Sequence, residues 1–590
     1  MQQMVIERHQ VSAEKIAAAR DDFTNRIGSM TRSMSKAGPI GAYEWEWISQ
    51  EMLDHLAALS VTEPALDSAE AWAILTDAAE AACAVVRYTA YHPWEPFNVF
   101  LDYVNFGISY DRGDDKEGWD TAGTGDWLDA YCLAVLADRV GRDGEAFHFA
   151  RKVVRKDAEG QPGAELVAGF LVCVEGDLDV DGQEFPPTRE AKVAAVDAAL
   201  ARIATRERQT GRALREHADT VALRVLRALV GGDREAYDRE LTALLAAVPA
   251  AQGPSAPPRS LLPLVPLALA ALGHRQEGWA VPVETGYLPR TLVTGFAPEG
   301  PRVGPFGRDR RADAVAVLAA GPVRCERPTW PVTPTWDIDG WYEEHTREDL
   351  TPEPGRPVLA RDVVRAMERQ QSLFLLRGAD PGAGSDGQVA ALRFASRLGG
   401  LLFRAALAEE GTEVRAECGG IDVVCGAFRG DKAGPGYWQT AVALALISGR
   451  REDLAPLVVA GPQLNGADGS AFATYREALH DYLRGVDPAP AAARALRGME
   501  QAREWGFFAP PAVLLSQLVE GDEESFNLAL LDALEAHRAH YSVSDRGETT
   551  AALLDLDVLA LACHARRRGW EVRVESEYLP ARLLSEARPV

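Results

Sequence analysis

Residues 553–583 read LLDLDVLALACHARRRGWEVRVESEYLPARL, and residues 262–292 read LPLVPLALAALGHRQEGWAVPVETGYLPRTL. With Trp279 aligned to Trp570, both stretches share the pattern G-W-x-V-x-V-E-x-x-Y-L-P. A shared pattern of this length indicates an internal duplication rather than an accident of composition. In each stretch an apolar, helix-like segment leads to a Gly-Trp turn and a short strand of alternating residues. Because each stretch ends one half of the chain, we call them the closing modules.

The two halves also share the order of their other landmarks. Residues 386–408 correspond to an amphipathic helix predicted over 68–90, and the helix that Trp438 opens corresponds to the one that Trp127 opens. The segment L-V-E-G-D-E-E-S-F near the second closing module restates L-V-G-G-D-R-E-A-Y near the first. The sequence therefore predicts a mainly α fold of two tandem α-helical domains, each closing with a short β-strand segment.

The segment after the long helix differs between the two halves, and the long helix of the second half contains a glycine pair. Residues 91–110 form an aromatic segment without a clear period, whereas the second half has a strand-like T-E-V-R-A-E-C after its first long helix. Gly399 and Gly400 lie inside that helix, and we interpret them as the site of a close helix crossing rather than a break.

The domain boundary is predicted from length and proline content. A chain of 590 residues is too long for one ordinary core. Residues 298–357 hold ten of the 35 prolines, a density that disfavours both helix and sheet, together with three tryptophans that favour packing against a domain. We therefore expect a first domain over 1–297, a linker or irregular elaboration over 298–357, and a second domain over 358–590.

Charge and cysteine content limit the partners and the compartment. A formal net charge of −25 argues against binding nucleic acid or an anionic membrane, and it suits either a basic partner or simple solubility. The seven cysteines are scattered and include no C-x-x-C pair, so no disulfide scaffold is expected. The start of the chain lacks a signal-peptide core, and the most apolar run, 261–273, is too short to span a bilayer. We expect a cytoplasmic protein.

Three strings suggest metal chemistry, and each has a simpler interpretation. D-L-D-V-D-G (177–182) matches the start of an EF-hand loop, but Thr188 stands where the bidentate Glu should be, so an acidic loop is favoured. D-D-K-E-G-W-D (114–120) resembles the aspartate-rich motif of all-α terpene cyclases, but flanking glycines indicate a loop. His537 and His540 share a helix face without an H-E-x-x-H glutamate, which favours a surface or capping role. We therefore predict no metal, no cofactor and no enzyme.

The closing modules supply the candidate partner contacts. Glu284 and Glu575 each follow an inward valine on the alternating strand, so both carboxylates should face outward. Tyr287 and Tyr578 follow in the same motif. Repeated residues in a duplicated chain are typical of core and capping positions, but the four residues Glu284, Tyr287, Glu575 and Tyr578 remain candidate partner-binding residues.

The second half resembles the immunity-49 family of bacterial immunity proteins. The similarity lies in F-N-L-A-L-L-D-A-L-E-A-H-R-A-H-Y (526–541) and in V-E-S-E-Y-L-P-A-R-L-L (574–584). In the first half, H-Q-V-S-A-E-K-I (9–16) resembles the usual beginning of the family and W-L-D-A-Y-C-L-A-V-L-A-D-R (127–139) its central helix. A typical member is a single domain of about half this length. This chain thus resembles a tandem form with a more diverged first copy, in which Gly286 replaces Glu577.

The resemblance implies a mostly α-helical, non-enzymatic protein, encoded beside a polymorphic toxin, that binds the toxin and blocks it. Many such toxins are nucleases, whose phosphate-binding faces tend to be basic. An acidic protein could occlude such a face and associate with it rapidly at low salt. Two alternatives stay open, namely an α-helical interaction scaffold unrelated to toxins and an all-α small-molecule enzyme that uses Asp114, Asp115 or the histidines. The sequence does not fix the oligomeric state.

Overall fold

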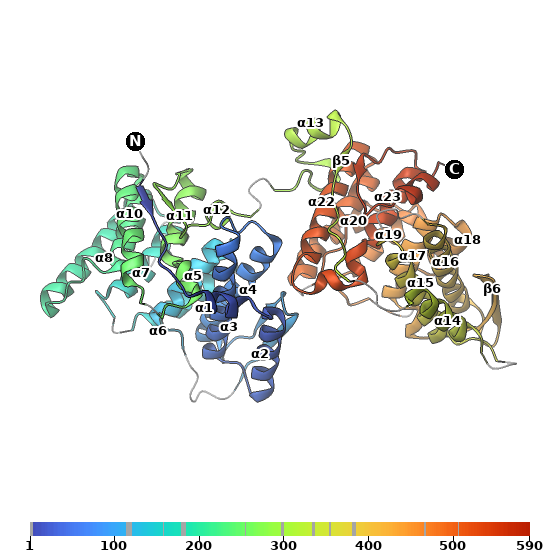
Figure 1. The fold of residues 1–590 in the computed structure, drawn as a ribbon, viewed down its shortest axis with the longest axis horizontal. Helices are drawn as coiled ribbons and strands as arrows, with labels where there is room; N and C mark the ends of the chain where they lie inside the picture. The colour runs from blue at the N-terminus through green and yellow to red at the C-terminus, as the bar shows by residue number, and fades with distance from the viewer. Residues whose placement is uncertain are drawn as a thin grey trace. The chain divides into compact units, whose positions relative to one another are not determined.

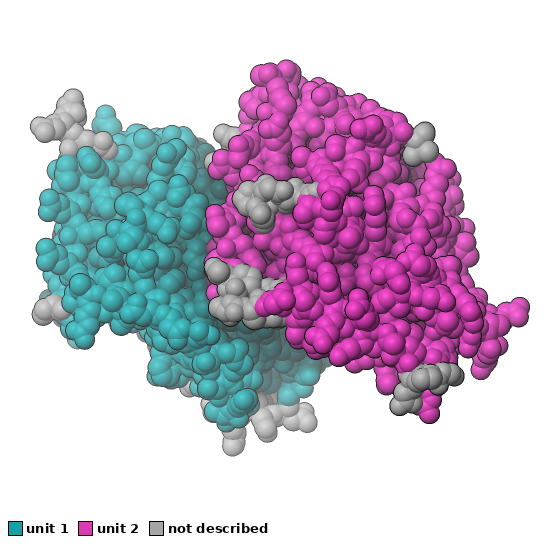
Figure 2. Space-filling model, turned by 45° about the vertical axis from the view of Figure 1, so that its right-hand side comes forward, with its two compact units in different colours: residues 1–299 teal, residues 300–590 magenta. Residues whose placement is uncertain are grey.

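The chain folds into two compact units, residues 1–299 and 300–590, which Figure 2 shows in different colours. Each unit is mainly α-helical and closes with a short strand, which confirms the predicted tandem fold (Figure 1). The computed structural model describes residues 4–113, 121–156, 158–178, 185–253, 255–296, 300–332, 337–352, 356–379, 385–464, 466, 468–504 and 507–589.

The first unit contains helices α1 to α12 and strands β1 to β4, with a π-helical turn at Leu171–Glu175 and a 3-10 turn at Pro258–Leu261. The helices are α1 Ala13–Arg20, α2 Phe23–Ala37, α3 Ala42–Thr62, α4 Ala69–Tyr91, α5 Thr124–Leu136, α6 Val140–Val154, α7 Pro162–Phe170, α8 Arg189–Thr210, α9 Ala218–Gly231, α10 Arg234–Ala251, α11 Leu264–Glu277 and α12 Arg290–Thr294. The strands are β1 Met4–Ile6, β2 Phe97–Leu101, β3 Phe106–Tyr110 and β4 Val283–Thr285.

The second unit contains helices α13 to α24 and strands β5 to β8, and from β5 onward its elements follow the order of the first unit with one helix fewer before the hairpin. The helices are α13 Ala312–Ala320, α14 Ile338–Leu350, α15 Ala360–Leu376, α16 Asp386–Leu407, α17 Pro435–Ser448, α18 Arg451–Ala460, α19 Ala473–Arg484, α20 Ala489–Glu504, α21 Ala512–Glu520, α22 Glu523–Tyr541, α23 Leu556–Arg567 and α24 Ala581–Glu586. The strands are β5 Val323–Arg324, β6 Glu413–Cys418, β7 Ile421–Gly426 and β8 Val574–Glu575.

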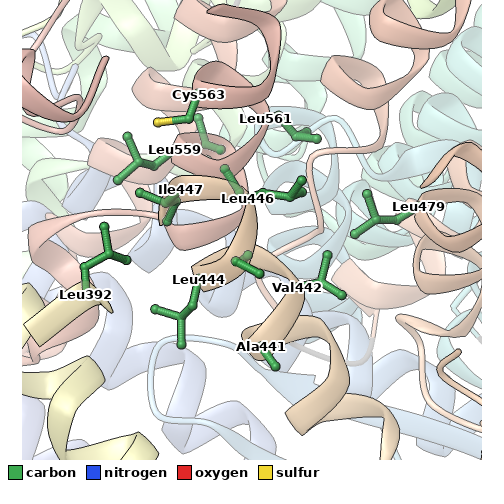
Figure 3. Packing of buried hydrophobic residues seen from close by; sticks show 14 of the residues in the cluster. Leu392, Ala441, Val442, Leu444, Leu446, Ile447, Leu479, Leu559, Leu561 and Cys563 are labelled. Carbon is green, nitrogen blue, oxygen red and sulfur yellow. The ribbon is translucent and has the colours of Figure 1, made fainter. Parts of the chain in front are cut away.

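The central helix of each unit, α5 or α17, is fixed by the tryptophan that opens it. Trp127 and Trp438 are both fully buried, and each indole N–H donates to a carbonyl of the next helix, Phe147 O at 3.2 Å and Leu457 O at 2.9 Å. A buried N–H needs such a partner, so the bond sets the angle between the two helices. In the second unit, apolar residues of α16, α19 and α23 pack around the apolar residues of α17 (Figure 3).

The glycine pair in α16 marks a close helix crossing, as predicted. A Cβ atom on Gly399 would lie 2.8 Å from the Cβ of Ala441 in α17, and one on Gly400 would lie 3.0 Å from the Cα of Asp453 in α18. The first distance is shorter than Cβ atoms in proteins adopt and the second is at the tight limit, so the two glycines let α17 and α18 approach α16 this closely.

Residues 91–110 form a helix end and the antiparallel hairpin β2–β3, which the sequence did not reveal. The hairpin pairs Phe97 with Tyr110, and their rings stack with centroids 4.5 Å apart. The second unit has the equivalent hairpin β6–β7, whose first strand was predicted. In β2–β3 aromatic residues occupy both strand faces, which hides the alternation that identifies a half-buried strand.

The first strand of each unit pairs with the strand of its closing module. In the first unit β1 runs parallel to β4, with Val5 opposite Glu284. In the second unit β5 runs parallel to β8, with Arg324 opposite Glu575. The first and last strands of each unit therefore lie side by side.

Much of the segment 298–357, which we interpreted as a linker, is part of the second unit. Arg302 forms ion pairs with Asp532 at 2.7 Å and Glu535 at 2.6 Å on α22. The backbone N–H of Phe306 donates to Ser516 Oγ at 3.1 Å on α21. Further along, β5 pairs with β8 and α14 packs against α15. The prolines separate short elements here instead of producing an open linker.

Candidate partner-binding surface

The Gly-Trp step that the two closing modules share is a helix cap. Gly278 after α11 and Gly569 near the end of α23 have φ values of 68° and 89°, in the left-handed region that favours glycine. The N–H of Trp279 then donates to Gly273 O, and that of Trp570 to Ala565 O, both at 3.1 Å. The glycines are thus explained by helix termination.

The strand after this cap divides its residues as the alternation predicts. Val283 and Val574 are 4% and 3% exposed, whereas Glu284 and Glu575 are exposed to solvent. Both glutamates therefore remain candidates for contact with a partner. Glu575 also lines a cleft of about 670 Å³ in the second unit, together with Arg324, Glu577 and Arg566.

Tyr287 and Tyr578 require a correction, because neither ring is accessible to a partner. Tyr287 is 0% exposed and Tyr578 is 2% exposed. The chain turns inward after each closing strand, and Tyr578 packs edge-on against the buried His537 with centroids 5.0 Å apart. Both tyrosines hold the module to its unit.

Tyr287 belongs to a chain of hydrogen bonds that superficially resembles a catalytic triad. Its hydroxyl accepts from the His9 backbone N–H at 2.8 Å and lies 2.7 Å from His9 Nδ1. His9 Nε2 lies 2.9 Å from Ser260 Oγ, whose own proton goes to Pro257 O at 2.6 Å. A nucleophilic serine would donate to the histidine instead. These bonds tie the start of the unit to its closing module.

The copies differ next to this tyrosine, where Gly286 corresponds to Glu577. Glu577 accepts from Arg324 Nη2 at 3.1 Å and from the backbone N–H of Arg327 at 3.2 Å. In the first unit the residue opposite Glu284 is Val5 rather than an arginine. Glu577 and Arg324 therefore occur together in the second unit, and the first unit has Gly286 and Val5 in their places.

The metal-like strings give no support for a metal site. The run 114–120 and most of the string 177–182 lie outside the described residues. His537 is 1% exposed, so it is a core residue rather than the surface or capping residue we expected. Within the described residues, no group of three or more His, Cys, Asp or Glu side chains could hold a metal ion.

The seven cysteine thiols are buried and unpaired with one another as disulfides. Burial raises the pKa of the Cys563 thiol to about 12, and burial also raises the pKa of the other six. A thiol needs a lowered pKa to act as a nucleophile, so none of these seven is activated. In the described part of the chain, no helix is long and apolar enough to cross a membrane.

An exposed aromatic face on α3 was not singled out from the sequence. Tyr43 is 59% exposed and Trp47 is 47% exposed, with their ring centroids 6.2 Å apart. Trp45 between them is fully buried and donates its indole N–H to Tyr110 Oη at 2.7 Å. The spacing of Tyr43 and Trp47, four residues apart and out of phase with the buried positions, is the signal that could have identified this face.

The observed geometry defines a duplicated, mainly α-helical protein whose two units end in the same capped helix and strand. A family model described as Immunity protein 49 matches residues 63–292 and 382–583, one segment in each unit. Because these segments cover more than half of the chain, the chain belongs to the immunity protein 49 family. Comparisons with curated proteins and with solved structures gave no match.

Proposed function

We propose that this chain neutralises a cognate polymorphic toxin by binding it stoichiometrically and covering its working surface. The match of both units to the immunity protein 49 family is the observation that carries this proposal. The chemistry of the described residues supports binding rather than catalysis, since the thiols are not activated and the Ser260 hydroxyl points away from His9. The seven buried thiols suit a reducing compartment, so we propose that the protein acts in the cytoplasm.

Co-expression tests the proposal directly. The toxin encoded next to this chain is expressed with and without it, and growth is measured. We expect this chain to restore growth and to co-purify with the toxin at a fixed ratio. Co-purification without rescue would favour an interaction scaffold. Rescue without a stable complex, accompanied by chemical change of a small molecule, would favour an enzyme.

The net charge of −25 suggests how the partner is attracted. If the toxin presents a basic, phosphate-binding face, long-range attraction should accelerate association, and salt should slow it. We therefore expect the association rate to fall by about tenfold or more between 20 mM and 500 mM salt. An unchanged rate would refute attraction by charge without refuting neutralisation.

A further inference from the structure

The exposed face of α3 has the composition of a binding surface. Large aromatic side chains with few rotatable bonds are enriched among the residues that dominate binding energy. Tyr43 and Trp47 both protrude from a helix that buried Trp45 and Ile48 anchor in the core. Their rings therefore form a preorganised platform. Because both rings are exposed to water, they contribute little to the stability of the unit.

Carboxylates of α3 and α5 lie near one another beside this helix. Glu46 lies between the two aromatic residues in sequence, and its pKa is raised by burial and by the nearby charge of Asp126, while Arg259 opposes the shift. Asp129 on α5 is exposed, yet surrounding protein and the charges of Asp126 and Glu46 raise its pKa to about 6. Burial is the first cause of both shifts, and the neighbouring carboxylates add to it, so Glu46, Asp126 and Asp129 form one acidic cluster.

Helix capping explains only part of this charge. Asp126 accepts from the N–H of Gly123 at 2.7 Å at the start of α5, which is a capping arrangement. Asp129 lies beyond the first turn, and Glu46 is on another helix. The charge of Arg259 reaches both carboxylates, and Arg259 is already paired with Asp54 at 2.7 Å. The face thus keeps an excess of negative charge.

The second unit has replaced this face at the equivalent positions of α15. Aligning the buried residues of α3 and α15 places Arg361 at the position of Tyr43, Val364 at that of Glu46, and Arg365 at that of Trp47. Both arginines are exposed, and Val364 is buried. Packing alone does not account for Tyr43 and Trp47, because the same fold forms without aromatic residues there. Neither α3 nor α15 lies within the segments that the family model matches.

We infer that Tyr43, Trp47 and Glu46 on α3, with Asp129 on α5, form a docking surface for a basic segment of the toxin. This inference rests on the proposed function and assigns the contact to the first unit. Arginine side chains of the toxin would stack on the two rings and pair with the carboxylates, an arrangement in which the aromatic and electrostatic contributions reinforce each other. The second unit, with Arg361 and Arg365 at these positions, would repel the same segment.

The experiment uses the full chain and the toxin encoded next to it, inactivated by substitution of a catalytic residue. Binding is measured by surface plasmon resonance. We expect Tyr43→Ala and Trp47→Ala each to weaken affinity by about 10- to 30-fold. The double variant Tyr43→Arg with Trp47→Arg, which installs the residues of the second unit, should weaken it by at least about 100-fold. Glu46→Gln with Asp129→Asn should lower the association rate and its dependence on salt.

Arg361→Ala with Arg365→Ala is the matched control at the equivalent positions of the second unit. We expect it to change affinity by less than about twofold, because it lies outside the docking surface. Thermal unfolding of every variant checks folding, and exposed positions should leave the transition unchanged. If the unmodified chain binds and protects but the α3 variants bind equally well, the docking surface is refuted and neutralisation stands. If the unmodified chain neither binds nor protects, the proposed function itself is refuted.

Discussion

The hydroxyl of Tyr237 occupies the space in which a Cβ atom on Gly273 would lie, and it donates to Leu269 O at 3.0 Å. In the second unit the equivalent residues are Phe526 and Ala565, between helices α22 and α23. Gly273 and Ala565 each accept the N–H of the closing-module tryptophan, which establishes their equivalence. The first unit therefore combines the hydroxyl of Tyr237 with a glycine. The second unit combines Phe526, which has no hydroxyl, with the methyl group of Ala565.

We expect Gly273→Ala to destabilise the first unit by about 1–3 kcal/mol, because the added methyl group meets the tyrosine hydroxyl. Tyr237→Phe in the same chain should recover part of this loss, because it removes the hydroxyl, whereas the ring carbon Cζ, 2.6 Å from the added methyl group, still has to shift. Urea unfolding of both single variants and the double variant gives the coupling energy. Strictly additive effects would show that the two residues do not compete for this space.

Replacing either central tryptophan should have a similar cost in its own unit. Trp127→Phe and Trp438→Phe each remove an indole N–H from a buried carbonyl and leave a small void. We expect a loss of about 2–4 kcal/mol in the free energy of unfolding of the unit concerned. Trp47→Phe, at an exposed position, is the control and should change stability by less than about 0.5 kcal/mol. Equal losses of stability in all three variants would contradict the hydrogen-bonding role of Trp127 and Trp438.

Arg327 and Arg8 occupy equivalent positions, three residues after the one that faces Glu575 or Glu284, but they make different contacts. The guanidinium of Arg327 donates to Leu553 O, Gly378 O and Ala379 O at 2.9–3.0 Å. Arg8 donates to Ser60 Oγ at 3.0 Å. We expect Arg327→Ala to cost the second unit about 2–4 kcal/mol, because it leaves buried carbonyls without donors.

The matched variant Arg8→Ala should cost the first unit about 1 kcal/mol, since it removes one such bond. Thermal unfolding of both variants compares the two. Arg327→Lys should rescue poorly, because a single ammonium group cannot reach three carbonyls in a plane. Full rescue by lysine would show that charge, rather than the shape of the guanidinium, holds this position.

Acid should destabilise both units through histidines that burial keeps neutral, namely His55 in the first unit and both His564 and His537 in the second. Burial lowers the pKa of His55 to about 4 and that of His564 to about 4, whereas an unfolded histidine titrates near 6.5. Below pH 6.5 the unfolded chain therefore binds more protons than the folded chain. We expect His55 and His564 each to reduce the free energy of unfolding by about 3 kcal/mol as pH falls from 6.5 to 4, and to have no such effect above pH 7.5.

Urea unfolding between pH 4 and 8 measures this dependence. His564→Gln should make the profile of the second unit less steep, with His537 still contributing, and leave that of the first unit unchanged. A profile in which stability rises toward pH 4 would have the wrong sign for a histidine that is buried in its neutral form.

The duplication was visible in the sequence because a long motif occurs twice. The repeated helical patterns then predicted the helical fold and the closing strands. The alternating residues of the closing strands also predicted that Glu284 and Glu575 are exposed. The burial of Tyr287 was not visible, because its partner His9 lies at the other end of the unit. Strands as short as β1 and β5 show no period, so their pairing with the closing modules depends on contacts distant in sequence. The proline content of 298–357 was misleading because prolines also separate short ordered elements.

The pairing of the first strand of each unit with its last has a consequence for how such a chain can grow. Since the first and last strands of each unit lie side by side, a second copy of the gene can be joined head to tail without separating these strands. The closeness of β1 and β4 predicts that the first unit tolerates circular permutation. Once duplicated, the two copies are free to diverge at their outer faces while their interiors keep one plan.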